Sequence, residues 1–77
     1  MGGVEEAIVQ IPLITILGNE SVNIENFLSI IEYGAECIRL KTKQGQIVVC
    51  GRNLIAKSMT QEEININGKI DSVEFAK

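Results

Sequence analysis

The chain has 77 residues, of which 45% are hydrophobic but only 4% aromatic, and its net charge at pH 7 is −3. This length allows one domain with a small aliphatic core, and the hydrophobic content excludes a disordered chain. The acidic balance argues against a nucleic-acid partner, because a phosphate backbone attracts a positively charged surface.

The first residues give no sign of a targeting segment. Glu5 and Glu6 stand where a signal peptide would carry basic residues. The longest apolar run, residues 11–17, is interrupted by Pro12 and Thr15 and is shorter than the roughly 18 residues of a membrane span. We therefore expect a cytoplasmic protein with no membrane span. Residues 1–10 are expected to form a leader or a short helix, and residues 11–77 a single all-β domain.

From residue 13 onward, apolar and polar side chains alternate in short runs, which is the pattern of half-buried strands. Pro12 marks the entry to the first run, because proline is tolerated at the start of an edge strand. Asn67-Gly68 is the strongest turn signal, since a type I′ turn needs positive φ at both central residues. Further turn signals lie at residues 18–19, 34–35, 44–45 and 51–53.

These runs and turns predict an all-β fold, an antiparallel meander of about eight short strands. The pattern leaves open whether the sheet closes into a barrel, stacks as a sandwich or extends like a solenoid. Gly18, Gly34, Gly51 and Gly68 recur at nearly equal intervals. Hairpins of similar length and an internal duplication both account for that spacing.

Several of the expected strands are apolar on both faces. Such strands lie either between two layers or at a contact between subunits. In a chain this short the second arrangement predicts a homo-oligomer. The side chains that would form its interaction surface are Leu13, Leu17, Val48, Cys50 and Ile55.

A row of basic side chains, Arg39, Lys41 and Lys43, lies along one face of a single expected strand. It is either a small basic stripe for an acidic partner or the solvated face of a sheet. We include Arg39 and Lys41 in the predicted interaction surface.

The residues of common catalytic and metal sites are scarce. The chain has no histidine, the usual general base and metal ligand. Cys37 and Cys50 are not in a CxxC motif, lie on separate expected strands, and lack the further ligands of a zinc site or the base of a catalytic thiol. We interpret both as small buried hydrophobic residues. The sequence therefore predicts no catalytic residue, no metal, no cofactor and no enzymatic activity.

An ordered series of short motifs extends over residues 11–76. In chain order it reads Ile14-Thr15-Ile16-Leu17-Gly18-Asn19, Ile24-Glu25-Asn26, Ile38-Arg39-Leu40-Lys41-Thr42, Gly45-Gln46-Ile47, Val49-Cys50-Gly51, Leu54-Ile55, Glu62-Glu63-Ile64 and Gly68-Lys69-Ile70-Asp71-Ser72-Val73-Glu74-Phe75. This series resembles the YabP/YqfC family of bacterial sporulation proteins, and the YqfC branch in particular. It departs from the family at Phe27 and Leu28, where a basic residue or histidine is frequent.

The resemblance implies a role in endospore formation in Firmicutes, in the mother cell and at the forespore surface, where coat and cortex are assembled. It attributes no catalytic residue to the family. It also implies a membrane-associated sporulation protein as a partner. The function expected from this analogy is a scaffold or interaction module.

Two other functions fit the pattern less well. A small β-barrel of the Sm-like or OB-like type would bind nucleic acid or a small ligand, but the acidity and the few aromatic residues argue against it. An enzyme would need residues from a partner chain to complete its site.

Overall fold

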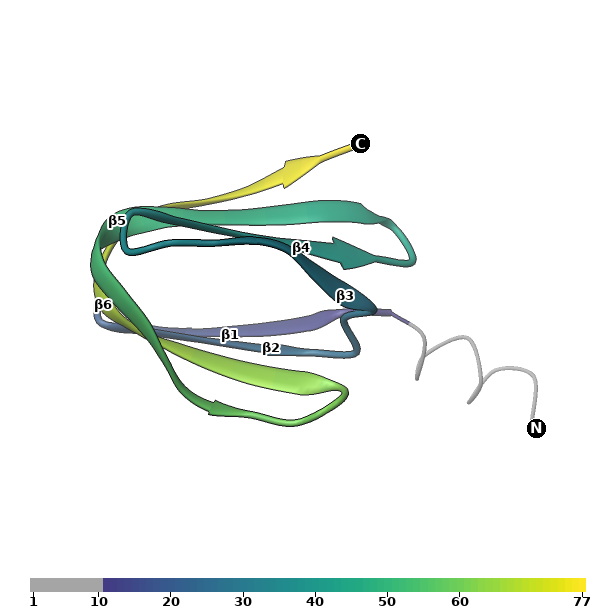
Figure 1. Cartoon of the computed structure of the whole chain (residues 1–77), viewed down its shortest axis with the longest axis horizontal. Coiled ribbons are helices and arrows are strands. Elements are labelled where there is room, and N and C mark those ends of the chain that lie inside the picture. The colour runs from purple at the N-terminus through teal and green to yellow at the C-terminus, as the bar shows by residue number, and fades with distance from the viewer. Residues whose placement is uncertain (1–10) are drawn as a thin grey trace.

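The computed structural model describes residues 11–77, all of whose regular structure is antiparallel β-sheet (Figure 1). The expected helix or leader over residues 1–10 lies outside the described residues. The strands are β1 (Leu13–Leu17), β2 (Ser21–Glu25), β3 (Ser29–Tyr33), β4 (Cys37–Thr42), β5 (Gly45–Met59) and β6 (Glu63–Ala76). They form one sheet in the order β1-β2-β6-β5-β4-β3.

The sheet is bent so that its two halves face each other, as Figure 1 shows. The bend lies in β5 and β6, the two long strands. The first half of β5 pairs with β4 and with the end of β6, whereas its second half pairs with the start of β6, which in turn pairs with β2. One long hairpin therefore contributes to both halves of the sheet.

Two glycines make this bend sterically possible. A Cβ on Gly51 would overlap the carbonyl oxygen of Lys69. Gly68 has φ 140°, and a Cβ there would lie 2.6 Å from the carbonyl oxygen of Asn53. Only glycine lets the two backbones approach this closely. The register between β5 and β6 shifts at the same place, between Cys50 and Gly51.

The predicted all-β antiparallel fold is confirmed, but the predicted count of about eight strands is wrong, because there are six. Residues 51–53 and Asn67-Gly68, which we predicted as turns, lie inside β5 and β6. At the bend, glycine allows two backbones to approach closely, whereas in a hairpin turn it allows a positive φ. The four regularly spaced glycines thus occupy unlike positions: Gly18 and Gly34 lie between strands, and Gly51 and Gly68 lie within them.

The hairpin between β5 and β6 instead turns at residues 60–62. The Thr60 hydroxyl accepts hydrogen bonds from the backbone N–H groups of Glu62 and Glu63, at 3.3 and 3.1 Å. The Thr60 N–H donates to the carbonyl oxygen of Glu63 at 2.7 Å. Threonine hydroxyls commonly accept backbone hydrogen bonds in turns in this way, but a threonine in the sequence is only a weak indication of a turn.

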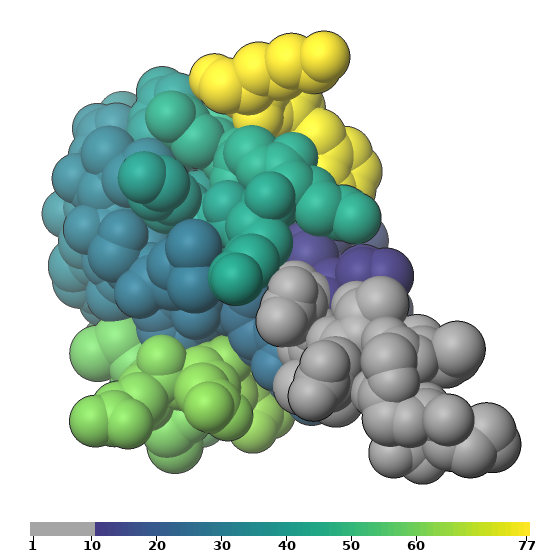
Figure 2. Space-filling model, turned by 90° about the vertical axis from the view of Figure 1, so that its right-hand side faces the viewer, coloured from purple at the N-terminus to yellow at the C-terminus, as the bar shows by residue number. Residues whose placement is uncertain are grey.

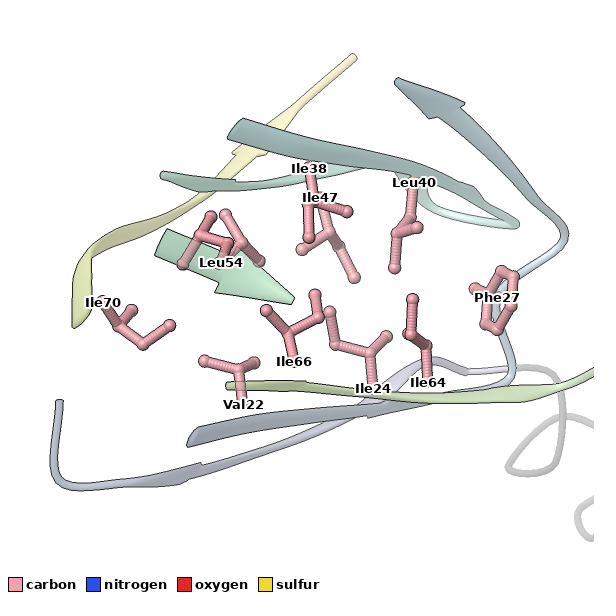
Figure 3. Close-up of a cluster of buried hydrophobic side chains, with 11 residues drawn as sticks. Val22, Ile24, Phe27, Ile38, Leu40, Ile47, Leu54, Ile64, Ile66 and Ile70 are labelled. Carbon is pink, nitrogen blue, oxygen red and sulfur yellow. The ribbon is translucent and has the colours of Figure 1, made fainter. Parts of the chain in front are cut away.

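The core lies between the two facing halves, and its side chains point toward one another in Figure 3. Apart from Phe27, which lies between β2 and β3, these side chains belong to the strands, and pairs such as Ile64 and Ile66 alternate as the period of two predicts. Full burial of one such aliphatic side chain stabilises the fold by about 1.5–3 kcal/mol. The cluster consists of Val22, Ile24, Phe27, Ile38, Leu40, Ile47, Val49, Leu54, Ile64, Ile66 and Ile70.

The sheet is open rather than closed into a barrel. Within residues 11–77, β1 and β3 stand at opposite ends of the strand order and do not pair with each other. The barrel that the sequence allowed is therefore excluded, and the Sm-like or OB-like alternative loses its structural basis. The open sheet also leaves strand edges unpaired.

Candidate interaction surface

Four stretches of strand have only one neighbouring strand among the described residues. Two are the terminal strands β1 and β3. The other two lie beyond the bend. The pairing of β4 with β5 ends at Cys50, and the pairing of β2 with β6 ends at Asn67. The second half of β5 and the second half of β6 are therefore also edges. Unpaired edges are templates for pairing with another chain.

Three of these edges carry features that oppose such pairing. In β3 the register is broken between Ile30 and Glu32 by a bulge, and the Glu32 carboxylate lies 3.6 Å from the Arg39 guanidinium. The edge of β5 is blocked at Ala56, whose N–H donates to the Tyr33 hydroxyl at 3.0 Å. The end of β6 carries two acidic residues, Asp71 and Glu74. Bulges, charges and side-chain caps are the usual protection of an edge.

Among residues 11–77, none of these features occurs at the β1 edge. Its five residues read Leu-Ile-Thr-Ile-Leu, without a charge, and all five pair with β2 in continuous register. Pro12 stands just before the strand and leaves the N–H groups within it intact. Pro12 was predicted to mark the entry to this strand, and β1 begins at the next residue, Leu13.

Both faces of β1 are apolar and accessible. Ile16 lies opposite the fully buried Val22 and so faces the core side, yet 51% of it is exposed because the strand is last in the sheet. Leu13 and Leu17 point to the outer face, where Leu17 is 65% exposed. Figure 2 shows this part of the chain, in purple, at the surface below the yellow C-terminal residues.

The other predicted surface residues do not join Leu13 and Leu17. Val48 is 8% exposed and Cys50 is half-buried, on the outer face of the opposite half of the sheet. On that face Arg39 Nη1 donates to Gln46 Oε1 at 3.1 Å, so this side chain is engaged within the chain, while its neighbour Lys41 is exposed.

Ile55 is exposed on the same outer face as Leu17, but polar residues separate the two. The row across this face runs from Leu17 through Ser21 and Asn67 to Ile55. Neighbouring amides form a ladder here, in which Asn23 Nδ2 donates to Glu63 Oε2 at 2.9 Å and Asn65 Nδ2 to Asn23 Oδ1 at 3.3 Å. The apolar surface at β1 is therefore narrow.

Sequence reasoning missed two exposed apolar groups. Phe75 lies opposite the buried Ile47 and so belongs to the core-facing side, but it is 74% exposed at the unpaired end of β6. A groove of about 360 Å³ between β3 and the second half of β5 is lined by Ile30, Tyr33, Ala56 and Met59. The alternation of apolar and polar residues predicts which face of the sheet a side chain lies on. The exposed fraction of that side chain also depends on whether its strand lies at an edge, which alternation does not predict.

The described residues were also compared with the requirements of a metal site and of a membrane-spanning helix. Among residues 11–77, no group of three or more acidic or cysteine side chains could hold a metal ion. Over the same residues there is no helix long and apolar enough to cross a membrane.

Comparison with known proteins places this sheet in a family. The model of the YabP family matches residues 10–77, which include all six strands. The chain belongs to the YabP family. It is similar to the uncharacterized protein YqfC of Bacillus subtilis (strain 168), with 33% identity over 70 residues that cover 91% of this chain and 75% of YqfC. The β1 edge lies within the residues matched by the YabP family.

Proposed function

We propose that this YabP-family protein is a non-enzymatic interaction module of endospore envelope assembly. It associates with itself through β1 and docks a membrane-associated sporulation protein in the mother cell. Family membership supports the sporulation role. The observation that carries the self-association is the uncharged, unprotected β1 edge.

The sequence of β1 suits pairing with its own copy. In an antiparallel pair with a two-fold axis at Thr15, Leu13 lies opposite Leu17 of the other copy, and Ile14 opposite Ile16. Every cross-strand pair is then apolar on both faces, apart from the central pair of threonines. Such pairs stabilise a sheet by roughly 0.2–1 kcal/mol each.

The expected association is weak, because the strand is short. A stable interface buries about 1,600 Å² in total, and a pair of five-residue strands supplies only part of that. We therefore expect a dimer whose population rises with protein concentration. A membrane-associated partner, or a further edge, would add the remaining contact area.

Light scattering behind a sizing column tests this association. The wild-type chain should exceed its 8.4 kDa monomer mass increasingly as concentration rises. Thr15→Lys should return it to the monomer, because two lysines would face each other at the two-fold axis. Ser58→Lys is the matched control, since Ser58 is also exposed on the outer face but lies in β5. A wild-type monomer at every concentration, or equal loss in both variants, would refute the proposal.

The biological role is tested separately in a spore-forming host. Deletion of the gene should lower the number of heat-resistant spores. The wild-type gene and Ser58→Lys should restore that number, and Thr15→Lys should not. Normal heat resistance after deletion would contradict the sporulation role without affecting the association measured in solution.

A further inference from the structure

The two cysteines of the chain are direct neighbours across β4 and β5. Cys37 and Cys50 are Cα partners in the antiparallel register, and both are free and half-buried. Our interpretation of them as buried hydrophobic residues is thus wrong in part. Because partners in a ladder point to the same face, the two thiols lie side by side on the outer face, away from the core.

The hydrogen bonds next to Cys37 and Cys50 show whether the two residues are a hydrogen-bonded or a non-hydrogen-bonded pair of the antiparallel ladder. The Gly51 N–H donates to the carbonyl oxygen of Glu36 at 2.9 Å, so Glu36 and Gly51 form a hydrogen-bonded pair. Hydrogen-bonded and non-hydrogen-bonded pairs alternate along antiparallel strands, which makes Cys37 and Cys50 a non-hydrogen-bonded pair. In pairs of this type the Cα atoms are typically about 4.5 Å apart and the side chains are close together. A disulfide requires a Cα separation of roughly 4.4–6.8 Å.

The thiols also contact each other. A hydrogen bond between the side chains of Cys37 and Cys50 is the main cause that raises the pKa of Cys37 from 9.0 to about 11. The backbone can therefore hold a disulfide with little rearrangement. A zinc site would require two further ligands, and no such cluster occurs among residues 11–77.

We propose that Cys37 and Cys50 are a reversible modification site, which a low-molecular-weight disulfide oxidises to an intramolecular disulfide between β4 and β5. The bond would tie the two strands together beside the bend at Gly51. It lies on the opposite half of the sheet from β1, so this proposal does not depend on the proposed function.

The chemistry is two successive thiol–disulfide exchanges with a disulfide RSSR. One cysteine thiolate attacks one sulfur of RSSR, the S–S bond breaks, and RS⁻ leaves. The other cysteine thiolate then attacks the protein sulfur of this mixed disulfide and displaces the second RS⁻. The two thiol protons pass to the two RS⁻ ions. The cysteines lose two electrons in total, and RSSR gains them and becomes two RSH.

The geometry does not require a particular order of attack. Because the two cysteines are direct partners across the ladder, either thiolate can resolve a mixed disulfide formed on the other.

Incubation of the reduced full chain with oxidised glutathione, followed by intact-mass measurement, tests the proposal. The wild-type chain should lose the mass of two hydrogen atoms, keep no glutathione, and become resistant to thiol alkylation. Dithiothreitol should restore both thiols. Cys37→Ser and Cys50→Ser should each retain one glutathione, because neither variant can resolve the mixed disulfide.

The wild-type measurement alone is decisive, so the proposal stays testable if a serine variant fails to fold. Wild-type chain that accumulates glutathione adducts, forms only disulfide-linked dimers, or remains fully alkylatable would overturn the proposal.

Discussion

Gly51 is the residue at which the fold most clearly requires the absence of a Cβ. Its neighbour across the bend is the backbone of Lys69, which cannot move away without breaking the β5–β6 ladder. Gly18 offers a comparison within the same chain, because its φ of 56° lies in the left-handed region whereas a Cβ there would meet nothing within 4 Å.

Gly51→Ala should therefore destabilise the fold by about 3 kcal/mol or more, as backbone overlap does. Gly18→Ala should cost only about 1–2 kcal/mol, the strain of a left-handed residue with a Cβ. Urea denaturation monitored by circular dichroism measures both values. Equal stabilities of the two variants would show that the backbones at the bend do not approach closely.

The Cys37 thiol also predicts that the stability of the fold depends on pH. Its pKa is higher in the folded chain, at about 11, than the ordinary 9.0, so the folded state holds the proton more tightly than the unfolded state. This contribution to stability is complete below pH 9.0 and is lost as pH rises through about 11. Under reducing conditions, the stability of the wild-type chain should fall more steeply over that range than that of Cys37→Ser. Parallel profiles would argue against the thiol contact.

At the scale of elements, the sequence predicted the inward faces better than the strand ends. Alternation is a local property of Ile64 and Ile66, and both are fully buried as expected. Asn67-Gly68 matched a hairpin turn equally well, but a turn of that type needs positive φ at both residues, and Asn67 does not have it. What decides the outcome is the backbone of Asn53, far away in sequence, against which Gly68 packs.

The interaction surface was predictable to a similar degree. The sequence indicated that Leu13 and Leu17 occupy a strand with two apolar faces, and both are exposed on β1. It could not separate them from Val48, which has the same local pattern but is covered because β5 has strands on both sides at that point. Position in the strand order is a property of the whole sheet.

For a single element, the turn between β5 and β6, we predict how substitutions of Thr60 change the stability of the chain. Thr60→Ala should remove two hydrogen bonds to the backbone and destabilise the chain by about 1 kcal/mol, the net value of such bonds. Thr60→Ser should retain most of that stability because it keeps the hydroxyl. Thermal and urea unfolding measure the difference. A serine variant as unstable as the alanine variant would assign the effect to the methyl group instead.

For the whole molecule, an open sheet explains why a chain with a complete core still exposes so much apolar surface. The bend closes the core between the two halves, but in the described residues it does not join β1 to another strand. Bulges, charges or the Tyr33 hydroxyl protect three edges, whereas no residue of the described range 11–77 protects the fourth in this way. This contrast is the physical basis for self-association through β1.

Disulfide trapping at the centre of β1 tests that claim most directly. In a background with Cys37→Ser and Cys50→Ser, Thr15→Cys places one thiol on the proposed two-fold axis, where it would meet its own copy. Mild oxidation should yield a covalent dimer of two 8.4 kDa chains in high proportion, and Ser58→Cys in the same background should yield little. A Thr15→Cys chain that stays monomeric, or a Ser58→Cys chain that dimerises as readily, would contradict pairing through β1.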